Sequence, residues 1–238
     1  MDIKLFLMEG QKEYLPNLSI DHVIIGYEEM QLKCLLLKIE EKWVLPGGYI
    51  KRIESVDEAA KRILKERTGL EGAYLKFLSV IGEEDRRFGS QWEKLFTKVT
   101  GLPYSDSYWI NDRFVTLAHY SLVQIEKVKL VAGEFDEEIA WHPFDTLPEM
   151  WLDHELIALK AREQLKIDLS HEQLSFNLLP TEFTMPELHQ LHQHIVQQSL
   201  DRSRFQKKML ASGDFERLPK LQKETPGRNP YLYRVKRE

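Results

Sequence analysis

The sequence contains one cysteine, Cys34, which excludes an internal disulfide. It also lacks any apolar run of the ~18 residues that a helix needs to cross a bilayer. Residues 1–15 include a short apolar patch, but no small-residue cleavage site follows, so we predict no signal peptide. These features predict a cytoplasmic protein with no membrane partner. Because Cys34 lies in an apolar segment, we expect a buried strand thiol rather than a nucleophile.

The charge is distributed unevenly along the 238 residues, although the net charge is only -5. Residues 201–238 contain 11 Lys and Arg against 5 Asp and Glu, whereas residues 1–200 contain 22 against 33. A basic tail on an acidic body indicates two parts with different partners. The positive sign of the tail favours a polyanion, and nucleic acid is the commonest one.

Strand patterns dominate the first part of the chain. Two apolar runs, residues 21–28 and 31–39, are joined by a short polar turn and predict a β-hairpin. Residues 43–48, WVLPGG, are expected to break the chain through a proline and two glycines. Further strands are predicted over residues 74–82, 113–125 and 137–144.

Two helices are predicted between and after these strands. The first begins at a capping box formed by Ser55 and Glu58 and ends at Gly69. The second covers residues 151–166 and is amphipathic over about four turns. Strands and helices mixed in this way predict an α/β (α+β) domain. We place its boundary after residue 168, which gives domains of residues 1–168 and 169–238.

Residues 48–70 carry the most specific motif of the chain and resemble the Nudix box. That pattern is a glycine, five residues, a glutamate, seven residues, and then Arg-Glu-apolar-x-Glu-Glu-x-Gly-apolar. The positions in register are Gly48, Glu54, Arg62, Leu64, Glu66, Gly69 and Leu70. The preceding WVLPGG is also typical of the family. The resemblance implies a Nudix α/β/α sandwich with a mixed sheet.

Two positions depart from the box. Ile63 stands where a glutamate should follow the arginine, and Arg67 replaces the second glutamate of the closing pair. In working members these glutamates hold Mg²⁺ or Mn²⁺ beside a pyrophosphate. We therefore expect no catalytic residues, no metal and no cofactor, and interpret Arg62 as a residue that maintains the loop–helix–loop shape. The alternatives are a surface ion pair of Arg62 with Glu58, and an active hydrolase of nucleoside diphosphate derivatives.

The tail predicts a helix, a turn, a second helix and a two-stranded wing. Thr184 and Glu187 form a second capping box, and Asp201 can cap a basic helix over residues 202–210. Phe205 and Met209 share one face of that helix and can anchor it. The tail resembles the winged helix of the Nudix-related transcriptional regulators, in which a Nudix-like domain senses a small molecule and the C-terminal winged helix binds operator DNA.

Two sets of residues are candidates for contacts with DNA and with the ligand. Arg204 and Gln206 are expected to read base edges, and Lys207 and Lys208 to contact phosphates. The whole expected DNA-binding set is Arg202, Ser203, Arg204, Gln206, Lys207, Lys208, Arg217 and Arg228. The expected ligand-binding set is Tyr49, Glu54, Arg62, Glu66, Asp85 and Arg86, while Trp43 is either a stacking surface or a core residue.

The resemblance implies a ligand-responsive transcriptional regulator that binds double-stranded operator DNA as a homodimer. The expected effector is a sugar or an ADP-ribose-like nucleotide, and the helix before Gly69 favours the sugar-responsive branch. Residues 88–110 form an aromatic-rich insertion that departs from the family, either a lid or a dimer contact. His189 and His192 are three residues apart on a helix, but His194 faces elsewhere and no cysteine is nearby, so we expect no zinc site. A scaffold that binds neither ligand nor DNA is a further alternative.

Overall fold

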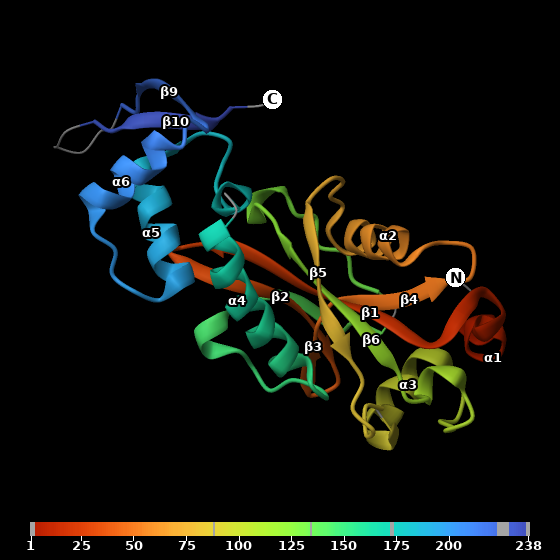
Figure 1. Ribbon diagram of the computed structural model, residues 1–238. Helices are drawn as coiled ribbons and strands as arrows, with labels where there is room; N and C mark the ends of the chain where they lie inside the picture. Colours follow the sequence, from red (N-terminus) through yellow and green to blue (C-terminus); the bar gives the residue numbers. More distant parts are fainter. Residues whose placement is uncertain (1–2, 88, 134, 172–173, 223–228, 237–238) are drawn as a thin grey trace.

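The computed structural model describes residues 3–87, 89–133, 135–171, 174–222 and 229–236. Its larger part is a seven-stranded mixed sheet with helices on both faces, and its C-terminal part is a smaller unit at one end of the molecule (Figure 1). No helix in the described ranges is long and apolar enough to cross a membrane.

The sheet is organised around one long strand. Strand order is β3–β2–β1–β6–β5, and both β2 and β4 pair antiparallel with β1 along different parts of its length. β1 runs parallel to β6, whereas β7 pairs antiparallel with β2. The strands are β1 (Tyr14–Glu28), β2 (Gln31–Ile39), β3 (Lys42–Val44), β4 (Gly47–Lys51), β5 (Tyr74–Ile81), β6 (Val115–Leu122) and β7 (Glu138–Pro143).

The central position of β1 explains its continuous apolar run, because side chains on both of its faces are buried. Val23 and Ile25 join the core against α4 (His154–His171), whereas Ile20 and Ile24 belong to clusters shared with α2 (Val56–Thr68). This alternation follows the two-residue period of a strand. The predicted layered α/β architecture is confirmed.

Several predicted boundaries are corrected. The hairpin is confirmed, with Glu28 opposite Gln31. Residues 43–48 do not end the sheet, because Gly47 and Gly48 begin β4. A Cβ on Gly47 would lie 2.5 Å from the Oδ1 atom of Asp21, so only glycine fits there. The helix predicted over residues 151–166 begins at His154 and ends at His171.

Two segments for which the sequence predicted no helix or strand lie together at one end of the sheet (Figure 1). The apolar start of the chain is a helix, α1 (Ile3–Glu13), and the insertion contains η1 (Gly89–Trp92), α3 (Glu93–Thr100) and η2 (Trp109–Asn111). Trp109 Nε1 donates to the carbonyl oxygen of Phe6 at 2.9 Å. A shared aromatic cluster holds them together: Phe6, Trp92, Phe96, Trp109 and Phe114.

The C-terminal unit has the predicted helix–turn–helix and wing. Its elements are η5 (Ser175–Leu178), β8 (Phe183–Thr184), α5 (Met185–Val196), α6 (Arg202–Ala211), β9 (Phe215–Lys220) and β10 (Tyr231–Val235). β10 lies between β8 and β9 in a three-stranded antiparallel sheet. Both predicted caps are present, with Thr184 and Glu187 in a reciprocal capping box and Asp201 accepting from the Arg204 N–H.

The two parts are packed against each other and share one buried apolar cluster. The hydroxyl of Tyr27, at the end of β1, lies 2.8 Å from Nδ1 of His194 in α5. Lys166 of α4 donates to Oε1 of Gln197, the C-cap residue of α5, at 2.6 Å. α4 therefore connects the middle of the large sheet with the helix–turn–helix. The remaining short turns are η3 (Ile125–Lys127) and η4 (Phe144–Thr146).

Candidate ligand cavity and DNA-reading helix

A cavity of about 470 Å³ opens at the end of the sheet where α1, α2 and the insertion meet. This volume lies within the usual range for a small-molecule site. The aromatic residues that line it are Phe6, Tyr14, Tyr49, Trp92, Phe114 and Phe135. The charged and titratable residues that line it are Asp21, Arg62, Glu66, Arg67, Arg86, Arg87, Asp112, Asp136 and His154.

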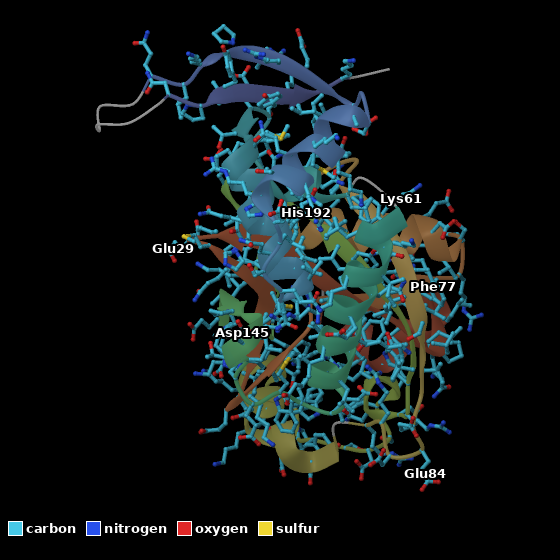
Figure 2. The ribbon with its side chains drawn as sticks, turned by 60° about the vertical axis from the view of Figure 1, so that its left-hand side comes forward. Glu29, Lys61, Phe77, Glu84, Asp145 and His192 are labelled. Carbon is cyan, nitrogen blue, oxygen red and sulfur yellow. The ribbon has the colours of Figure 1, made fainter. Side chains whose placement is uncertain are left out.

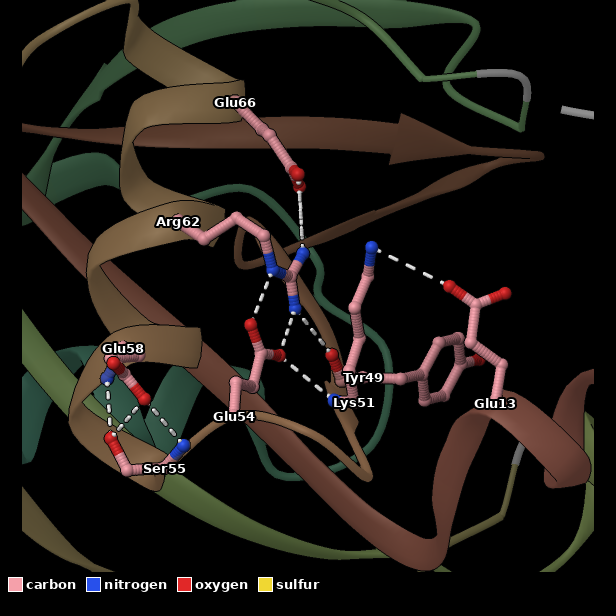
Figure 3. A network of polar contacts seen from close by, with 8 residues as sticks. All are labelled: Glu13, Tyr49, Lys51, Glu54, Ser55, Glu58, Arg62 and Glu66. Carbon is pink, nitrogen blue, oxygen red and sulfur yellow. Dashed lines mark hydrogen bonds and ion pairs between the residues drawn. The ribbon is translucent and has the colours of Figure 1, made fainter.

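Arg62 is the centre of a hydrogen-bond network at one side of this cavity (Figure 3). Its guanidinium donates two bonds to Glu54, at 2.6 and 2.9 Å, one to the Tyr49 carbonyl at 2.9 Å, and others to Glu66 at 3.1 and 3.2 Å. Glu54 also accepts from the Lys51 N–H at 2.8 Å. Arg62 thus ties α2 to the loop before it, which supports its interpretation as a residue that maintains the shape.

The alternative pairing of Arg62 with Glu58 is wrong. The carboxylate of Glu58 accepts instead from the backbone and hydroxyl of Ser55, both at 2.8 Å, as the capping box requires. The hydrogen bonds from Arg62 hold the pKa of Glu54 below its ordinary value, even though partial burial opposes this shift. Glu54 is therefore stabilised as a carboxylate that is ion-paired with Arg62, which disfavours its protonation.

A second arginine, Arg86, is buried at the base of the cavity. It donates to Asp21 at 2.6 Å and to both carboxylate oxygens of Asp153 at 3.0 and 3.1 Å. Burial alone would raise the pKa of Asp21, but the neighbouring His154 and Arg86 hold that pKa below its usual value. The cluster links β1, the segment after β5, and the residue that directly precedes α4.

The positions that depart from the motif have other roles. Ile63 is buried, and its side chain fills the space beside Gly48, where a Cβ would approach Ile63 to 3.1 Å. Arg67 pairs with Asp136 of the loop before β7 at 2.6 Å. An aliphatic side chain and an ion-paired arginine therefore occupy the two positions where the motif has glutamates.

The structure brings most of the predicted ligand residues together. Tyr49, Arg62, Glu66 and Arg86 line the cavity, whereas Glu54 is held behind Arg62 and does not line it. Asp85 is exposed and lies outside the lining. Trp43 is buried and packs against His142 with ring centroids 4.2 Å apart, so its interpretation as a core residue is confirmed.

Several residues that line the cavity were not predicted from the sequence. Asp21 is the first residue of an apolar run, and Arg87 follows the predicted Arg86 directly, so both could have been suspected from position. Phe6 and Phe135 carry no signal, because they come from segments far apart in the chain with no motif of their own. Only the packing of α1 and of the loop before β7 brings them to one cavity.

The helix α6 presents a polar, basic surface. Phe205 and Met209 are buried, as predicted from their spacing, while Arg202, Ser203, Arg204, Gln206, Lys207 and Lys208 are all exposed. Arg217, on β9, is exposed and lies over the ring of Tyr231 at 3.4 Å from its centroid. Arg228 lies outside the described residues. The remaining predicted DNA contacts therefore share one helix and one wing.

The histidines of α5 have structural partners. His192, labelled in Figure 2, is buried, and its Nε2 lies 2.8 Å from the Ser175 hydroxyl. His189 Nε2 lies 2.8 Å from the carbonyl oxygen of Leu200. Both rings also pack against Phe205, with centroids 4.8 and 5.1 Å away. These contacts account for the histidines as part of the helix–turn–helix core.

Acidification should destabilise this core. Burial lowers the pKa of His192 from 6.5 to about 4, and Lys208 and His189 act in the same direction. Between these two pKa values the imidazole binds a proton in the unfolded chain but not in the folded chain. The free energy of unfolding therefore falls as the pH drops from about 6.5 towards 4, by up to roughly 3 kcal/mol. Urea unfolding at pH 7 and pH 4.5 measures the effect. His192→Gln should show a smaller loss, and equal losses in both proteins would contradict this assignment.

Comparison with known proteins agrees with the two-part architecture. The sequence profile of the NUDIX domain matches residues 21–160, more than half of the chain. The chain belongs to the Nudix family. A second profile, the NrtR DNA-binding winged helix domain, matches residues 175–235. The fold class and the combination of domains predicted from the sequence are thereby confirmed.

Relatives of this Nudix protein share both parts. The chain is 24% identical over 241 residues to the "ADPR responsive transcriptional repressor NtrR" of Acinetobacter baylyi, covering 96% of this chain and 86% of that protein. It resembles the crystal structure of Shewanella oneidensis NrtR complexed with a 27mer DNA, with TM-score 0.68, 22% identity and coverage of 92% and 93%. A MutT/nudix family protein from Enterococcus faecalis gives TM-score 0.66, 22% identity and coverage of 99% and 94%.

The residues of this Nudix domain do not fit the metal of the catalytic members. The Ile63 side chain offers no oxygen, Arg67 adds a positive charge, and Glu54 and Glu66 are both bonded to Arg62. Within the described residues, no group of three or more His, Cys, Asp or Glu side chains could hold one ion. A hard divalent cation needs several such oxygens, and these residues do not provide them.

Proposed function

We propose that this protein is a ligand-responsive, DNA-binding transcriptional regulator. Its winged helix reads operator DNA, and its Nudix domain binds the effector in the 470 Å³ cavity. The observation that carries the proposal is α6, which exposes six polar and basic side chains above two buried anchors beside a wing. A helix of this kind fits the major groove of B-DNA.

An ADP-ribose-like nucleotide is the effector that we propose first. A relative similar over 96% of this chain is named as ADPR responsive, and the cavity offers both aromatic and cationic side chains. This choice differs from the preference for a sugar that the motif helix suggested. A sugar such as arabinose is the comparison ligand.

We also propose that the chain is divided into two functional domains. We place the sensor in residues 1–168 and the DNA-binding domain in residues 169–238, with the junction in the last turns of α4. We propose a homodimer, because a single short helix reads few base pairs and two-fold proteins match palindromic operators. Such a protein acts in the cytoplasm, with the DNA that it reads.

Binding to DNA from upstream of its own gene tests this function. The logarithm of the association constant should fall linearly with the logarithm of salt concentration, because Lys and Arg that neutralise phosphates release counterions. Binding that is absent at low salt, or that does not discriminate this DNA from random sequence, would exclude a regulator of this gene. Absent binding would also favour the scaffold interpretation.

Arg204→Ala should weaken binding to the operator by roughly 1–3 kcal/mol and relax its sequence preference, as expected for an arginine with a bidentate contact to guanine. Lys207→Ala, on the same helix, is the matched control. It should weaken binding to operator and random DNA about equally, because phosphate contacts carry little sequence information. Fluorescence anisotropy with both DNAs measures the difference, and an unchanged operator-to-random ratio for Arg204→Ala would remove its reading role.

A further inference from the structure

Arg87 is the arginine of the cavity lining that no carboxylate of the described residues engages. Arg62, Arg67 and Arg86 are each ion-paired. Arg87 also lines the cavity, but its side chain is exposed and forms no hydrogen bond or ion pair with any residue that the structure describes. An anionic group that enters the cavity can therefore bind Arg87 without first displacing a carboxylate.

Aromatic side chains form a wall in the same region. Phe114 N–H donates to the carbonyl oxygen of Arg86 at 3.3 Å, which places Phe114 next to the backbone that carries Arg87. Trp92 lies five residues after Arg87, and the centroid of its ring is 5.3 Å from that of Phe135. Together with Phe6 from α1, these residues line the cavity, and we call them the aromatic wall: Phe6, Trp92, Phe114 and Phe135.

The segments that carry Phe6 and Trp92 of the aromatic wall are fastened by contacts within the chain. The insertion is fastened to α1 through Trp109 and Phe6, and Gly10 permits their close contact, since a Cβ there would lie 2.6 Å from Trp109. On its other side, Leu95 N–H donates to Glu40, and Lys98 pairs with Glu137 at 3.5 Å. A wall held from both sides loses little further entropy when a planar ring stacks on it.

We propose that Arg87 and the aromatic wall form a subsite for a ligand with a planar ring and a phosphate-type anion, that is, a nucleotide. Arg87 binds the anion, and the aromatic wall accepts the ring. Arg87 and the aromatic wall would then determine specificity, selecting a nucleotide over an uncharged sugar. The inference rests on the proposed function in that the ligand bound here is the effector.

Calorimetric titration of the full chain with ADP-ribose, AMP and arabinose tests the subsite. Arg87→Ala should weaken ADP-ribose and AMP binding about 10- to 100-fold, the usual range for a lost charge-assisted hydrogen bond. Phe135→Leu should weaken both about 2- to 10-fold through lost stacking. The matched controls, Lys94→Ala and Tyr108→Leu, change a cation and an aromatic side chain of the neighbouring insertion outside the cavity lining, and should bind like wild type.

The outcomes separate the subsite from the proposed function. If wild type binds ADP-ribose but Arg87→Ala and Phe135→Leu bind it equally well, the subsite is wrong and the regulator stands. Tighter binding of arabinose than of either nucleotide would overturn the ligand class. If no probe binds and operator affinity responds to none of them, both proposals fail. Thermal unfolding of each variant checks that it is folded, which is expected for Arg87→Ala because this side chain is exposed.

Discussion

Replacing Arg86 with leucine should lower the free energy of unfolding by about 3–5 kcal/mol, the usual range when one partner of a buried ion pair is removed. The guanidinium is 5% exposed and is shared by Asp21 and Asp153, whose side chains are 10% and 14% exposed. Leucine leaves both carboxylates buried without a counter-charge. Urea unfolding at pH 7 measures the change.

Arg87→Leu is the matched control for this experiment. It removes the same charge one residue away, from an exposed side chain with no polar partner among the described residues. The free energy of unfolding should change by no more than about 0.5 kcal/mol. Similar losses for the two variants would show that net charge, and not the buried cluster, sets the stability.

Phe205→Ala should destabilise the winged helix by about 3–5 kcal/mol, as large-to-small changes of buried aromatic residues do. Phe205 is 8% exposed and fastens α6 to His189 and His192 of α5. Losing this anchor should abolish operator binding, because the reading helix is no longer held on its support. Ligand binding in the distant cavity should persist.

Leu210→Ala provides the comparison on the same helix. Leu210 is 44% exposed, so its truncation should change the free energy of unfolding by less than about 1 kcal/mol and leave operator binding intact. Circular dichroism and DNA binding are measured on both variants. Operator affinity that survives Phe205→Ala would mean that α6 is not held as the structure indicates.

Local signals predicted much of this molecule. The capping boxes at Ser55 and Thr184, the hairpin around Glu28, and the anchors Phe205 and Met209 all depend on residues a few positions apart, and each is observed. The Nudix motif likewise placed Tyr49, Arg62 and Glu66 at one cavity, because that loop and helix form a contiguous segment of chain.

The features that could not be predicted depend on packing between segments far apart in the sequence. Phe6 reaches the cavity only after α1 folds against the sheet, and Phe135 reaches it from the loop before β7. Neither segment carries a periodic pattern that shows its partner. Gly47 and Gly48 resemble a chain break locally, yet pairing with β1 makes them the start of β4. Tertiary contacts overrode local preference in both cases.

The interpretation as a sensor is tested most directly by titrating ADP-ribose, with Mg²⁺ present, into the complex of the full chain with its upstream DNA. DNA affinity and the chemical state of the nucleotide are followed in the same sample. We predict that operator affinity changes about 5- to 150-fold, a typical allosteric coupling, and that the ADP-ribose is recovered intact. Rapid cleavage of the pyrophosphate together with unchanged operator affinity would contradict this interpretation and identify a hydrolase.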